Sequence, residues 1–304
     1  MNNIIEIKNL TKSYGTLKAV QDVSFNVREG ELFAFLGVNG AGKSTTINIM
    51  CTTLSKDSGN IFIDGTDIDV DALSVKNKIG VVFQSSVLDR ALTVRDNLEH
   101  RASLYGITGK EFQKRLHELS ETFKFQDLLG RTLGKLSGGQ KRRIDIARAL
   151  IHKPKILILD EPTTGLDPQT RKLIWDTVND LRKKESMTVF LTTHYMEEAA
   201  EADYVVIIDS GRIAAKGTPL ELKNTYTEDY ITLYNIDEEG VKKLSSAYSK
   251  IKNGYRITVP DTMQATSLIV KHPELFIDYE ITKGKMDDVF LAVTGKKLTG
   301  GDGK

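Results

Sequence analysis

The sequence predicts an α/β fold in which a largely parallel core sheet is covered by helices. Four short apolar runs indicate this fold, because strands buried on both faces have continuous rather than alternating hydrophobic residues. Helical patterns separate the runs, an alternating β segment precedes them, and a small α+β segment follows them. The apolar runs are residues 32–36, 79–83, 156–159 and 188–191.

Two strands with alternating apolar and polar residues are predicted at the start of the chain, at 4–8 and 17–27. In the second strand Val23, Phe25 and Val27 share one face, since neighbouring side chains of a strand point to opposite sides. We therefore expect an N-terminal antiparallel β subdomain with one buried face.

A helical insertion is predicted over about residues 88–150, between the second and third apolar runs. Its first helix starts after Thr93, because Thr93 and Asp96 have the spacing of a capping box. Two apolar stripes at helical spacing then place one face of each helix in a core. The stripes are Val94, Leu98, Ala102 and Tyr105, then Phe112, Leu116, Leu119 and Phe123.

Residues 1–222 are expected to form the first domain and residues 223–294 a small α+β accessory domain. A helix from Pro168 to about Lys184 and a short helix begun by Thr218 come before the division, each with a proline at its first position. Residues 295–304 are rich in Gly and Lys and are expected to be disordered. The accessory domain is predicted to contain strands at 230–236, 255–259 and 276–281, a helix at 262–271 and a last helix over 286–293.

Composition excludes several classes of protein. The 304 residues include 42 Lys and Arg against 41 Asp and Glu, and a net charge of +1 does not indicate a nucleic-acid-binding protein. The single cysteine, Cys51, excludes an internal disulfide and a multi-cysteine zinc site. No apolar run approaches the roughly 20 residues that span a bilayer, and the start has no signal-peptide pattern. We therefore expect a cytoplasmic chain.

A glycine-rich loop follows the first apolar run and precedes a helical stretch over 45–54. Its sequence, Gly37-Val38-Asn39-Gly40-Ala41-Gly42-Lys43-Ser44, fits G-x-x-x-x-G-K-[ST] in the strand-to-helix context of a phosphate loop. Inward-pointing N–H groups and the helix N-terminus attract phosphate, Lys43 reaches the terminal phosphates, and the Ser44 hydroxyl ligates Mg²⁺. The residues expected to hold the nucleotide are Gly37, Val38, Asn39, Gly40, Ala41, Gly42, Lys43, Ser44 and Thr45.

Two carboxylates end the third apolar run, at Asp160 and Glu161. A parallel sheet presents its carboxyl edge to ligands, and the phosphate loop lies at the same edge. Asp160 can hold the Mg²⁺ water shell, and Glu161 can orient or deprotonate an attacking water. Two solvated acids at a strand end are the alternative interpretation.

A second phosphate-binding surface is predicted at Leu136-Ser137-Gly138-Gly139-Gln140, directly before a basic helix over 141–151. Taken alone, Ser-Gly-Gly is an ordinary turn or helix cap. Its position between the phosphate loop and the acidic strand end favours the functional interpretation.

In this order of motifs, residues 1 to about 220 resemble the nucleotide-binding subunit of an ABC transporter. The resemblance implies a P-loop NTPase fold of the ABC ATPase type, with the antiparallel subdomain, mixed core sheet, helical insertion and small C-terminal α+β domain described above. Gly37–Ser44 resembles the Walker A loop, and Asp160 and Glu161 resemble the Walker B acids. Leu136–Gln140 resembles the signature motif, so Ser137, Gly138, Gly139 and Gln140 would contact ATP.

Four single residues acquire roles from this resemblance. Tyr14 is similar to the aromatic residue that stacks on adenine, Gln84 to the Q-loop glutamine and His194 to the switch histidine. Asp167, in Gly165-Leu166-Asp167, is similar to the D-loop aspartate. Each also has a structural interpretation: Tyr14 as a strand-edge aromatic, Gln84 and Asp167 as caps, and His194 as an ordinary structural histidine. We interpret His100, His117, His152 and His272 as structural.

The resemblance implies ATP and Mg²⁺ as ligands, with Glu161, His194 and Gln84 catalytic and Ser44, Gln84 and Asp160 at the metal. It also implies a head-to-tail pair of two such domains, expected to be a homodimer, in which each ATP lies between the Walker A loop of one and the signature of the other. The chain would bind separate polytopic permease subunits at the inner face of the cell membrane. Residues 85–105 would contact them, with Val87, Leu88, Leu92 and Val94 either forming that apolar surface or packing within the insertion.

Two features favour a drug-resistance or ABC-2-type exporter over an importer. They are the stretches 163–171 and 192–199 together, and the ending Met286–Gly295 after a small accessory domain. The alternative function is a soluble ABC ATPase that acts on ribosomes or DNA, although the chain lacks the fused second domain or long coiled coil of such proteins. A regulatory switch with negligible turnover is a third interpretation, and Glu161 argues against it.

Overall fold

The computed structural model describes residues 2–296, so Met1 and residues 297–304, most of the expected tail, lie outside the described residues. The chain forms two compact units, Met1–His194 with Ala202–Ile213, and Tyr195–Glu201 with Ala214–Lys304. The division therefore falls at Ala214 rather than at 222. Helix α8 (Pro219–Tyr226) belongs to the second unit because it packs against the last helix, α11 (Met286–Thr294).

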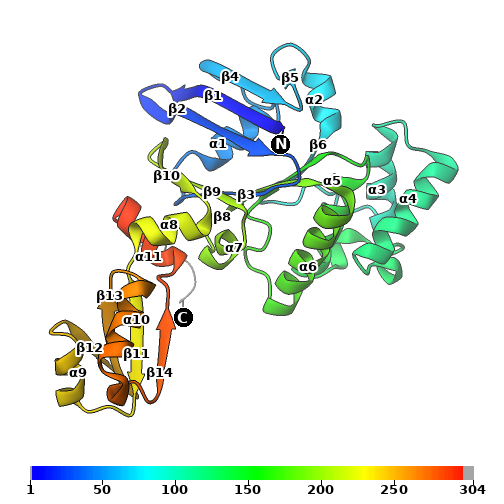
Figure 1. Ribbon diagram of the computed structural model, residues 1–304. Helices are drawn as coiled ribbons and strands as arrows, with labels where there is room; N and C mark the ends of the chain where they lie inside the picture. The colour runs from blue at the N-terminus through cyan, green and yellow to red at the C-terminus, as the bar shows by residue number, and fades with distance from the viewer. Residues whose placement is uncertain (1, 297–304) are drawn as a thin grey trace. The chain divides into compact units, whose positions relative to one another are not determined.

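An antiparallel sheet of order β2-β1-β4-β5 opens the first unit (Figure 1). The first strand runs from Asn3 to Tyr14 and is longer than the predicted 4–8, because pairing with two neighbours continues past several bulges. The segment 58–78, to which the sequence assigned no elements, supplies β4, β5 and a short helix. Bounds are β1 Asn3–Tyr14, β2 Leu17–Arg28, β4 Ser58–Ile63, β5 Thr66–Asp67 and α2 Ala72–Lys78.

The core sheet has the order β10-β9-β3-β8-β7-β6, and the pairs β9/β3, β3/β8, β8/β7 and β7/β6 are parallel. Parallel pairing brings the carboxyl ends of these strands to one edge. The four predicted apolar runs are therefore confirmed as buried parallel strands. Bounds are β3 Leu32–Leu36, β6 Ile79–Val82, β7 Ile156–Asp160, β8 Thr188–Thr193, β9 Tyr204–Asp209 and β10 Arg212–Gly217.

One apolar core joins the antiparallel sheet, the parallel sheet and helix α1. The rings of Phe25 and Phe33 stack with centroids 5.1 Å apart, and Phe33 stacks on Phe190 at the same distance. Helix α1 (Lys43–Met50), which ends before the predicted Leu54, buries Ile47 and Ile49 in this core. Packing thereby fixes the loop that enters α1.

The helical insertion contains two amphipathic helices and two short 3₁₀ turns before the helix that follows the signature. The capping box of Thr93 and Asp96 is confirmed, and Pro168 stands at the start of its helix, capped by Asp167. Bounds are α3 Val94–Ser103, α4 Gly109–Thr122, η1 Gln126–Leu128, η2 Leu133–Lys135, α5 Gly138–Leu150, α6 Pro168–Glu185 and α7 Met196–Ala200.

The second unit folds around an antiparallel sheet of order β12-β13-β11-β14 with its own apolar core. The strand predicted at 276–281 begins only at Tyr279, because Pro273 starts a 3₁₀ turn. Bounds are β11 Asp229–Tyr234, α9 Glu238–Leu244, β12 Tyr248–Ile251, β13 Gly254–Val259, α10 Thr262–Lys271, η3 Pro273–Leu275 and β14 Tyr279–Thr282.

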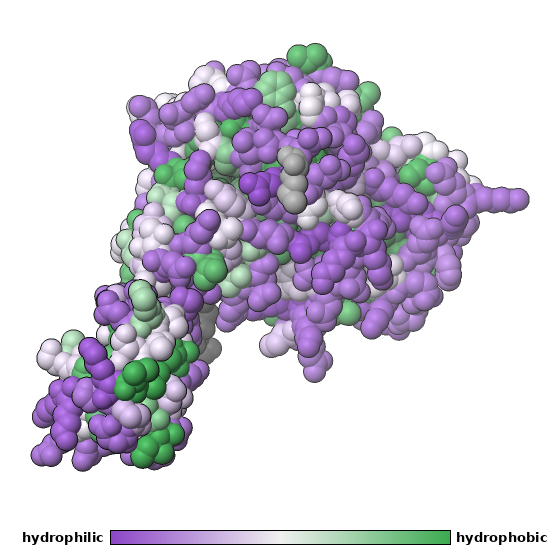
Figure 2. All heavy atoms as spheres, viewed as in Figure 1, coloured by the Kyte–Doolittle hydropathy of each residue, from purple (hydrophilic) through white to green (hydrophobic). Residues whose placement is uncertain are grey.

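The visible surface is mainly hydrophilic, with scattered apolar side chains (Figure 2). Among the described residues, no helix has the length and apolarity to span a bilayer.

A buried histidine gives the first unit an acid-sensitive point. The ring of His152 stacks on Tyr105 at 3.9 Å, and its Nε2 lies 3.1 Å from the carbonyl oxygen of Ile79. Its Nδ1 is buried and has no hydrogen-bond partner among the described residues. Burial lowers the pKa of His152 to about 4, and nearby arginines, including Arg101, add to this effect.

We expect the replacement His152→Gln to reduce the loss of stability in acid. The unfolded histidine, with a pKa near 6.5, binds a proton that the folded one does not, so stability present above pH 6.5 is lost as pH falls towards 4. Between pH 7.5 and 5.0 wild-type should lose about 2 kcal/mol more than the variant. Urea unfolding followed by fluorescence of Trp175 measures this, with His117→Gln, an exposed histidine, as control. Equal losses in wild-type and His152→Gln would contradict the assignment.

Candidate functional site

A cavity of about 320 Å³ lies at the carboxyl edge of the parallel sheet, beside the glycine-rich loop. It collects residues from the end of β1, the start of β2, the loop after β3, the start of α1, and the segments after β6 and β7. The structure thus brings together most of the predicted nucleotide and catalytic residues. Its lining residues are Tyr14, Leu17, Ala19, Val38, Asn39, Gly40, Gly42, Lys43, Ser44, Thr45, Gln84 and Glu161.

The loop between β3 and α1 depends on glycine at two positions. A Cβ on Gly37 would lie 2.5 Å from the carbonyl oxygen of Ile208, which is too close for any side chain. Gly42 has a φ of 110°, and its Cβ would lie 2.5 Å from the carbonyl oxygen of Ala19. The loop can therefore wrap closely around a ligand only with these residues.

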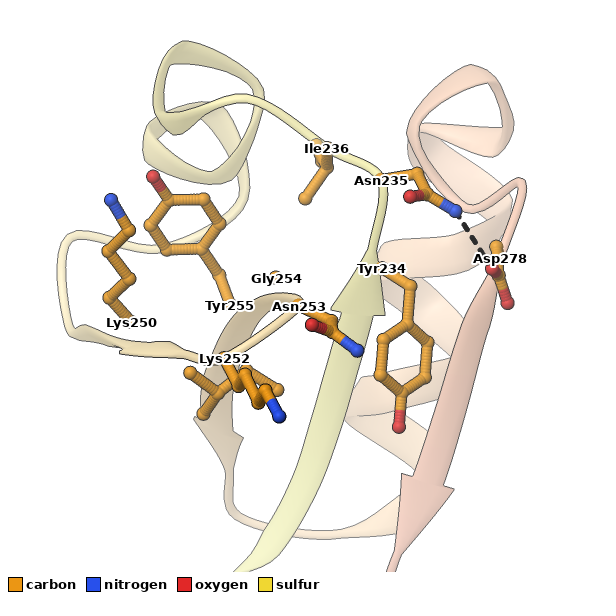
Figure 3. A pocket seen from close by; sticks show the side chains of 10 residues that line it. Tyr234, Asn235, Ile236, Lys250, Lys252, Asn253, Gly254, Tyr255 and Asp278 are labelled. Carbon is orange, nitrogen blue, oxygen red and sulfur yellow. Dashed lines mark hydrogen bonds between the residues drawn. The ribbon is translucent and has the colours of Figure 1, made fainter.

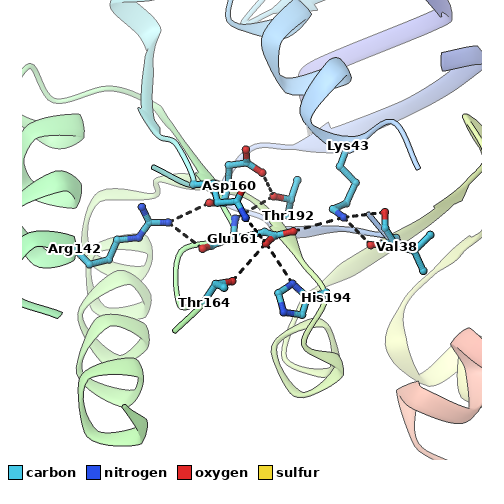
Figure 4. Close-up of polar contacts among 10 residues, drawn as sticks. Val38, Lys43, Arg142, Asp160, Glu161, Thr164, Thr192 and His194 are labelled. Atoms are coloured by element: carbon cyan, nitrogen blue, oxygen red, sulfur yellow. Dashed lines mark hydrogen bonds and ion pairs between the residues drawn. The ribbon is translucent and has the colours of Figure 1, made fainter. Parts of the chain in front are cut away.

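Lys43 is buried, with 5% of its surface exposed, although it carries a charge. Its Nζ donates to the carbonyl oxygens of Gly37 (2.7 Å) and Val38 (3.3 Å) and lies 3.7 Å from Oε1 of Glu161 (Figure 4). Burial lowers the pKa of Lys43, and the carboxylates of Glu161 and Asp160 oppose this shift. The ammonium group is held at the cavity by acceptors that a phosphate could replace.

Asp160 ends β7 and is 6% exposed. Its Oδ1 accepts a hydrogen bond of 2.6 Å from Oγ1 of Thr192 on β8. Burial raises the pKa of Asp160, while the bond from Thr192 lowers it. With the Ser44 hydroxyl and the Gln84 amide at the cavity, this carboxylate supplies the oxygen ligands that Mg²⁺ prefers, so these residues fit that metal.

The Glu161 carboxylate is the centre of the polar contacts at the site (Figure 4). Its Oε2 accepts from Gln84 Nε2 at 3.1 Å and lies 3.4 Å from His194 Nδ1. Thr164 Oγ1 donates to the same oxygen at 3.5 Å. Of the predicted catalytic residues, Gln84 and His194 therefore both contact Glu161, at the ends of three neighbouring strands.

The backbone of Glu161 is left-handed, with a φ of 47°. For a residue with a Cβ this conformation costs on the order of 1 kcal/mol, so its surroundings must stabilise it. The Glu161 N–H donates to both the carbonyl oxygen (3.1 Å) and the Oγ1 (3.2 Å) of Thr192. Thr192 thus supports both acids of this strand end.

The remaining residues predicted for the same site differ in their surroundings. Tyr14, at the end of β1, is 49% exposed and lines the cavity, with Lys12 Nζ 5.9 Å from its ring centroid. Asp167 caps α6, accepting from the N–H of Thr170 at 2.9 Å. That contact corresponds to the structural interpretation of Asp167.

The signature residues lie outside the cavity. Ser137 caps α5, and Gln140 completes a capping box with it. A Cβ on Gly139 would lie 2.7 Å from Thr170 Cγ2, whereas one on Gly138 would have no atom within 4 Å. Ser137, Gly138, Gly139 and Gln140 are therefore not brought to the phosphate loop of their own chain.

The predicted apolar contact surface after Gln84 is buried at two of its four residues, half-buried at Leu92 and exposed at Val87. Leu88 and Val94 are 7% and 0% exposed and pack within the insertion, while Val87 is 55% exposed. Leu88 and Val94 therefore follow the second interpretation, and Val87 remains available for contact with another chain.

The second unit has a hollow of its own, of about 530 Å³, near the β12–β13 turn (Figure 3). The hydrogen bond across it runs from Asn235 Nδ2 to Asp278 Oδ2 (3.2 Å). Its two lysines, Lys250 and Lys252, are exposed rather than buried. Binding sites combine enclosure with convergent polar groups, so the first-unit cavity is the better candidate site.

Three residues at the site escaped the sequence analysis as contributors: Thr164, Thr192 and Arg142. Thr192 and Thr164 lie within stretches used to recognise the exporter class, but single hydroxyls carry no spacing signal. Arg142, two residues after the signature, is buried. It lies in a basic helix, and nothing in the sequence distinguishes it from the exposed basic residues expected there.

Comparison with known proteins gives one family and a group of full-length relatives. The ABC transporter family matches residues 20–164. A Nod factor export ATP-binding protein I of Burkholderia orbicola is 35% identical over 97% of this chain and 98% of its own. The linearmycin resistance ATP-binding protein LnrL of Bacillus subtilis is 36% identical over 97% and 99%. The doxorubicin resistance ATP-binding protein DrrA of Mycobacterium tuberculosis is 35% identical over 95% and 93%.

Solved structures of ATP-binding cassettes align with the larger part of the chain. The dimeric ATP-binding cassette MJ0796 bound to ADP and Pi aligns with a TM-score of 0.66 at 28% identity, covering 71% of this chain and 98% of that one. CbiO1 from Clostridium perfringens, part of the ABC transporter complex cbiONQ, aligns with a TM-score of 0.68 at 30% identity, covering 73% and 91%.

Proposed function

This chain belongs to the ABC transporter family as an ATP-binding subunit, and from that membership we propose that it powers a drug or ABC-2-type exporter. It is an ATPase, and hydrolysis supplies the energy for transport. One observation carries the proposal about its site: the phosphate loop, Gln84 and Glu161 line one cavity, and the signature lies outside it.

We assign ATP to this cavity. The triphosphate would bind the N–H groups of Gly37–Ser44 and Lys43, and the exposed ring of Tyr14 would stack on adenine. Ser44, Gln84 and Asp160 would hold Mg²⁺, which neutralises phosphate charge when bound. The ammonium group of Lys43 already lies among carbonyl and carboxylate oxygens. Phosphate oxygens would replace these acceptors when ATP binds, and the charge would remain in a polar site.

Hydrolysis is assigned to Glu161 as the residue that orients or deprotonates the attacking water. Its contacts with Gln84 and His194 support this role, because phosphoryl transfer depends on positioning and charge stabilisation. His194 would stabilise the transferred phosphate, and Gln84 would link the water to the metal. Thr192 keeps Glu161 and Asp160 in position.

The exposed signature supports pairing of two copies of the chain. In one copy the signature lies outside the cavity that the phosphate loop lines. In a symmetric head-to-tail pair the signature of each copy would meet the phosphate loop of the other, which would complete two equal ATP sites. The open space next to Gly138 leaves room for phosphate or for backbone of the partner. Asp167, at the start of α6, would face the partner while capping its helix.

The transport path belongs to separate permease subunits in this proposal, and the chain would bind them at the inner face of the cell membrane. Val87 provides the exposed apolar contact of the segment after Gln84. The names of the full-length relatives are those of export and resistance proteins, which supports export. The alternative, a soluble ATPase acting on ribosomes or DNA, is not favoured.

The replacement Glu161→Gln should leave ATP binding intact and lower kcat by about 100-fold or more, because the general base is lost. The variant should accumulate as an ATP-bound dimer in size-exclusion chromatography. Glu185→Gln, an exposed glutamate on α6, is the matched control. Undiminished turnover would remove Glu161 from its role.

Affinity purification of the Glu161→Gln variant from solubilised membranes should recover a polytopic membrane protein. Ribosomal or DNA-repair proteins in its place would contradict the transporter assignment.

The replacement Lys43→Ala should weaken ATP binding by about tenfold or more, since a charged hydrogen bond to phosphate is lost. Isothermal calorimetry measures the affinity, with Lys110→Ala on the exposed face of α4 as control. Unchanged affinity would count against the phosphate-loop assignment.

The replacement Gly138→Ala separates the signature's role from folding. The new Cβ meets no atom of its own chain, so Tm should change by less than about 3 °C. ATP-driven dimerisation should nevertheless fall, because the methyl group occupies the face offered to the partner. Gly130→Ala, another glycine with open space and no positive φ, is the control. Normal dimerisation of Gly138→Ala would argue against a signature-mediated pair.

A further inference from the structure

A single buried arginine connects the helix after the signature to the catalytic strand end. Arg142 lies at the start of the second turn of α5 and is 7% exposed. Its guanidinium group donates to four backbone carbonyls: Nε to Pro162 at 2.6 Å, Nη1 to Phe83 at 2.6 Å, and Nη2 to Asp160 at 3.1 Å and Glu161 at 3.0 Å. Figure 4 shows Arg142 reaching this strand end from its helix.

These carbonyls belong to the peptide groups next to the reacting side chains. Phe83 immediately precedes Gln84, and the carbonyls of Asp160 and Glu161 flank Glu161 on both sides. The Glu161 N–H is held by Thr192, so Arg142 and Thr192 together fix a left-handed residue from opposite sides. Without the guanidinium group, Glu161 would lose the donors that its two neighbouring carbonyls require.

We propose that Arg142 is a positioning residue for ATP hydrolysis, whose planar guanidinium group fixes the backbone of Glu161 and of Gln84 so that both side chains face the attacking water. This assignment rests on the proposed ATPase site, since it concerns the same glutamate. Arg142 acts through Glu161 and Gln84 and touches no substrate atom itself.

The planar guanidinium group matters here rather than the positive charge. Arginine offers five N–H donors in a rigid plane, whereas lysine has one flexible ammonium group. Four carbonyls on two segments, Phe83 and residues 160–162, require donors in several directions at once. The same helix also contacts the strand before Gln84, because Arg148 Nη2 donates to the carbonyl of Val81 at 2.6 Å.

The test compares Arg142→Lys and Arg142→Gln with Arg143→Lys. Arg143 lies next to it on α5, but its Nη1 donates to the carbonyls of Phe123 and Lys124 in the insertion, away from Glu161. Arg142→Lys keeps the charge without the planar group, and Arg142→Gln leaves no unpaired buried cation. Full-length proteins are assayed for steady-state ATP hydrolysis, ATP affinity and Tm.

We expect kcat to fall by about tenfold to 100-fold in both Arg142 variants, as small displacements of catalytic groups produce such losses. ATP affinity should stay within about twofold, because the phosphate loop is untouched. Arg143→Lys should retain the wild-type kcat. Wild-type kcat in Arg142→Lys would overturn the proposal, and so would loss of folding in both Arg142 variants, which would assign the residue to stability alone. A wild-type chain without ATP hydrolysis would instead refute the proposed function.

A double replacement tests whether Arg142 acts through Glu161. In the Glu161→Gln background, Arg142→Lys should cost less than about threefold in residual single-turnover rate, because the group that it positions is already inactive. Multiplication of the two losses would show that Arg142 acts independently of Glu161 and would overturn its role in positioning that glutamate.

Discussion

Lys43, Arg142, Asp160 and Glu161 are buried together at the carboxyl edge of the parallel sheet, each with no more than 9% of its surface exposed. A buried charge costs several kcal/mol unless a partner is held in place. The partners here are fixed backbone and strand-end groups: loop carbonyls for Lys43, strand-end carbonyls for Arg142, and Thr192 for Asp160. The sheet, the glycine loop and helix α5 must therefore keep their relative positions for these charges to be tolerated, and this requirement explains the close backbone contacts at Gly37 and Gly42.

The Lys43–Glu161 contact connects ligand binding to catalysis. The ammonium group lies 3.7 Å from the carboxylate that the proposed function makes the base. An anionic phosphate on the loop would compete for the same ammonium group, since hydrogen bonds between charged groups are the stronger ones. Binding of ATP would thereby release one Glu161 oxygen while Gln84 and His194 still hold the other. The carboxylate would then be available for water only when the substrate is present.

The sequence predicted those parts of the fold whose signals are local. Buried parallel strands, the capping box at Thr93 and the proline start of α6 depend on neighbouring residues. The phosphate loop and the two acids stand at strand ends, whereas the signature and Asp167 stand at helix starts. The segment 58–78 was not predicted, because its strands are short and interrupted by Gly59 and Gly65. The strand expected from 276 was delayed by the turn that Pro273 starts. Arg142 could not be predicted as a site residue, because its four partners are backbone carbonyls from two segments that are distant from it in the sequence.

In the proposed head-to-tail pair, helix α5 would connect the two ATP sites physically. Its N-terminus carries Ser137–Gln140, which would contact the ATP on the partner's phosphate loop. About one turn further on it carries Arg142, which donates to the carbonyl of Glu161 in its own chain. A shift of this helix caused by one ATP would therefore reach the glutamate that serves the other ATP. The rigid connection spans a single helical turn, so little of the displacement would be absorbed on the way. Coupling between the sites would follow from a contact within each chain, and it would require no change in the interface beyond closure of the pair.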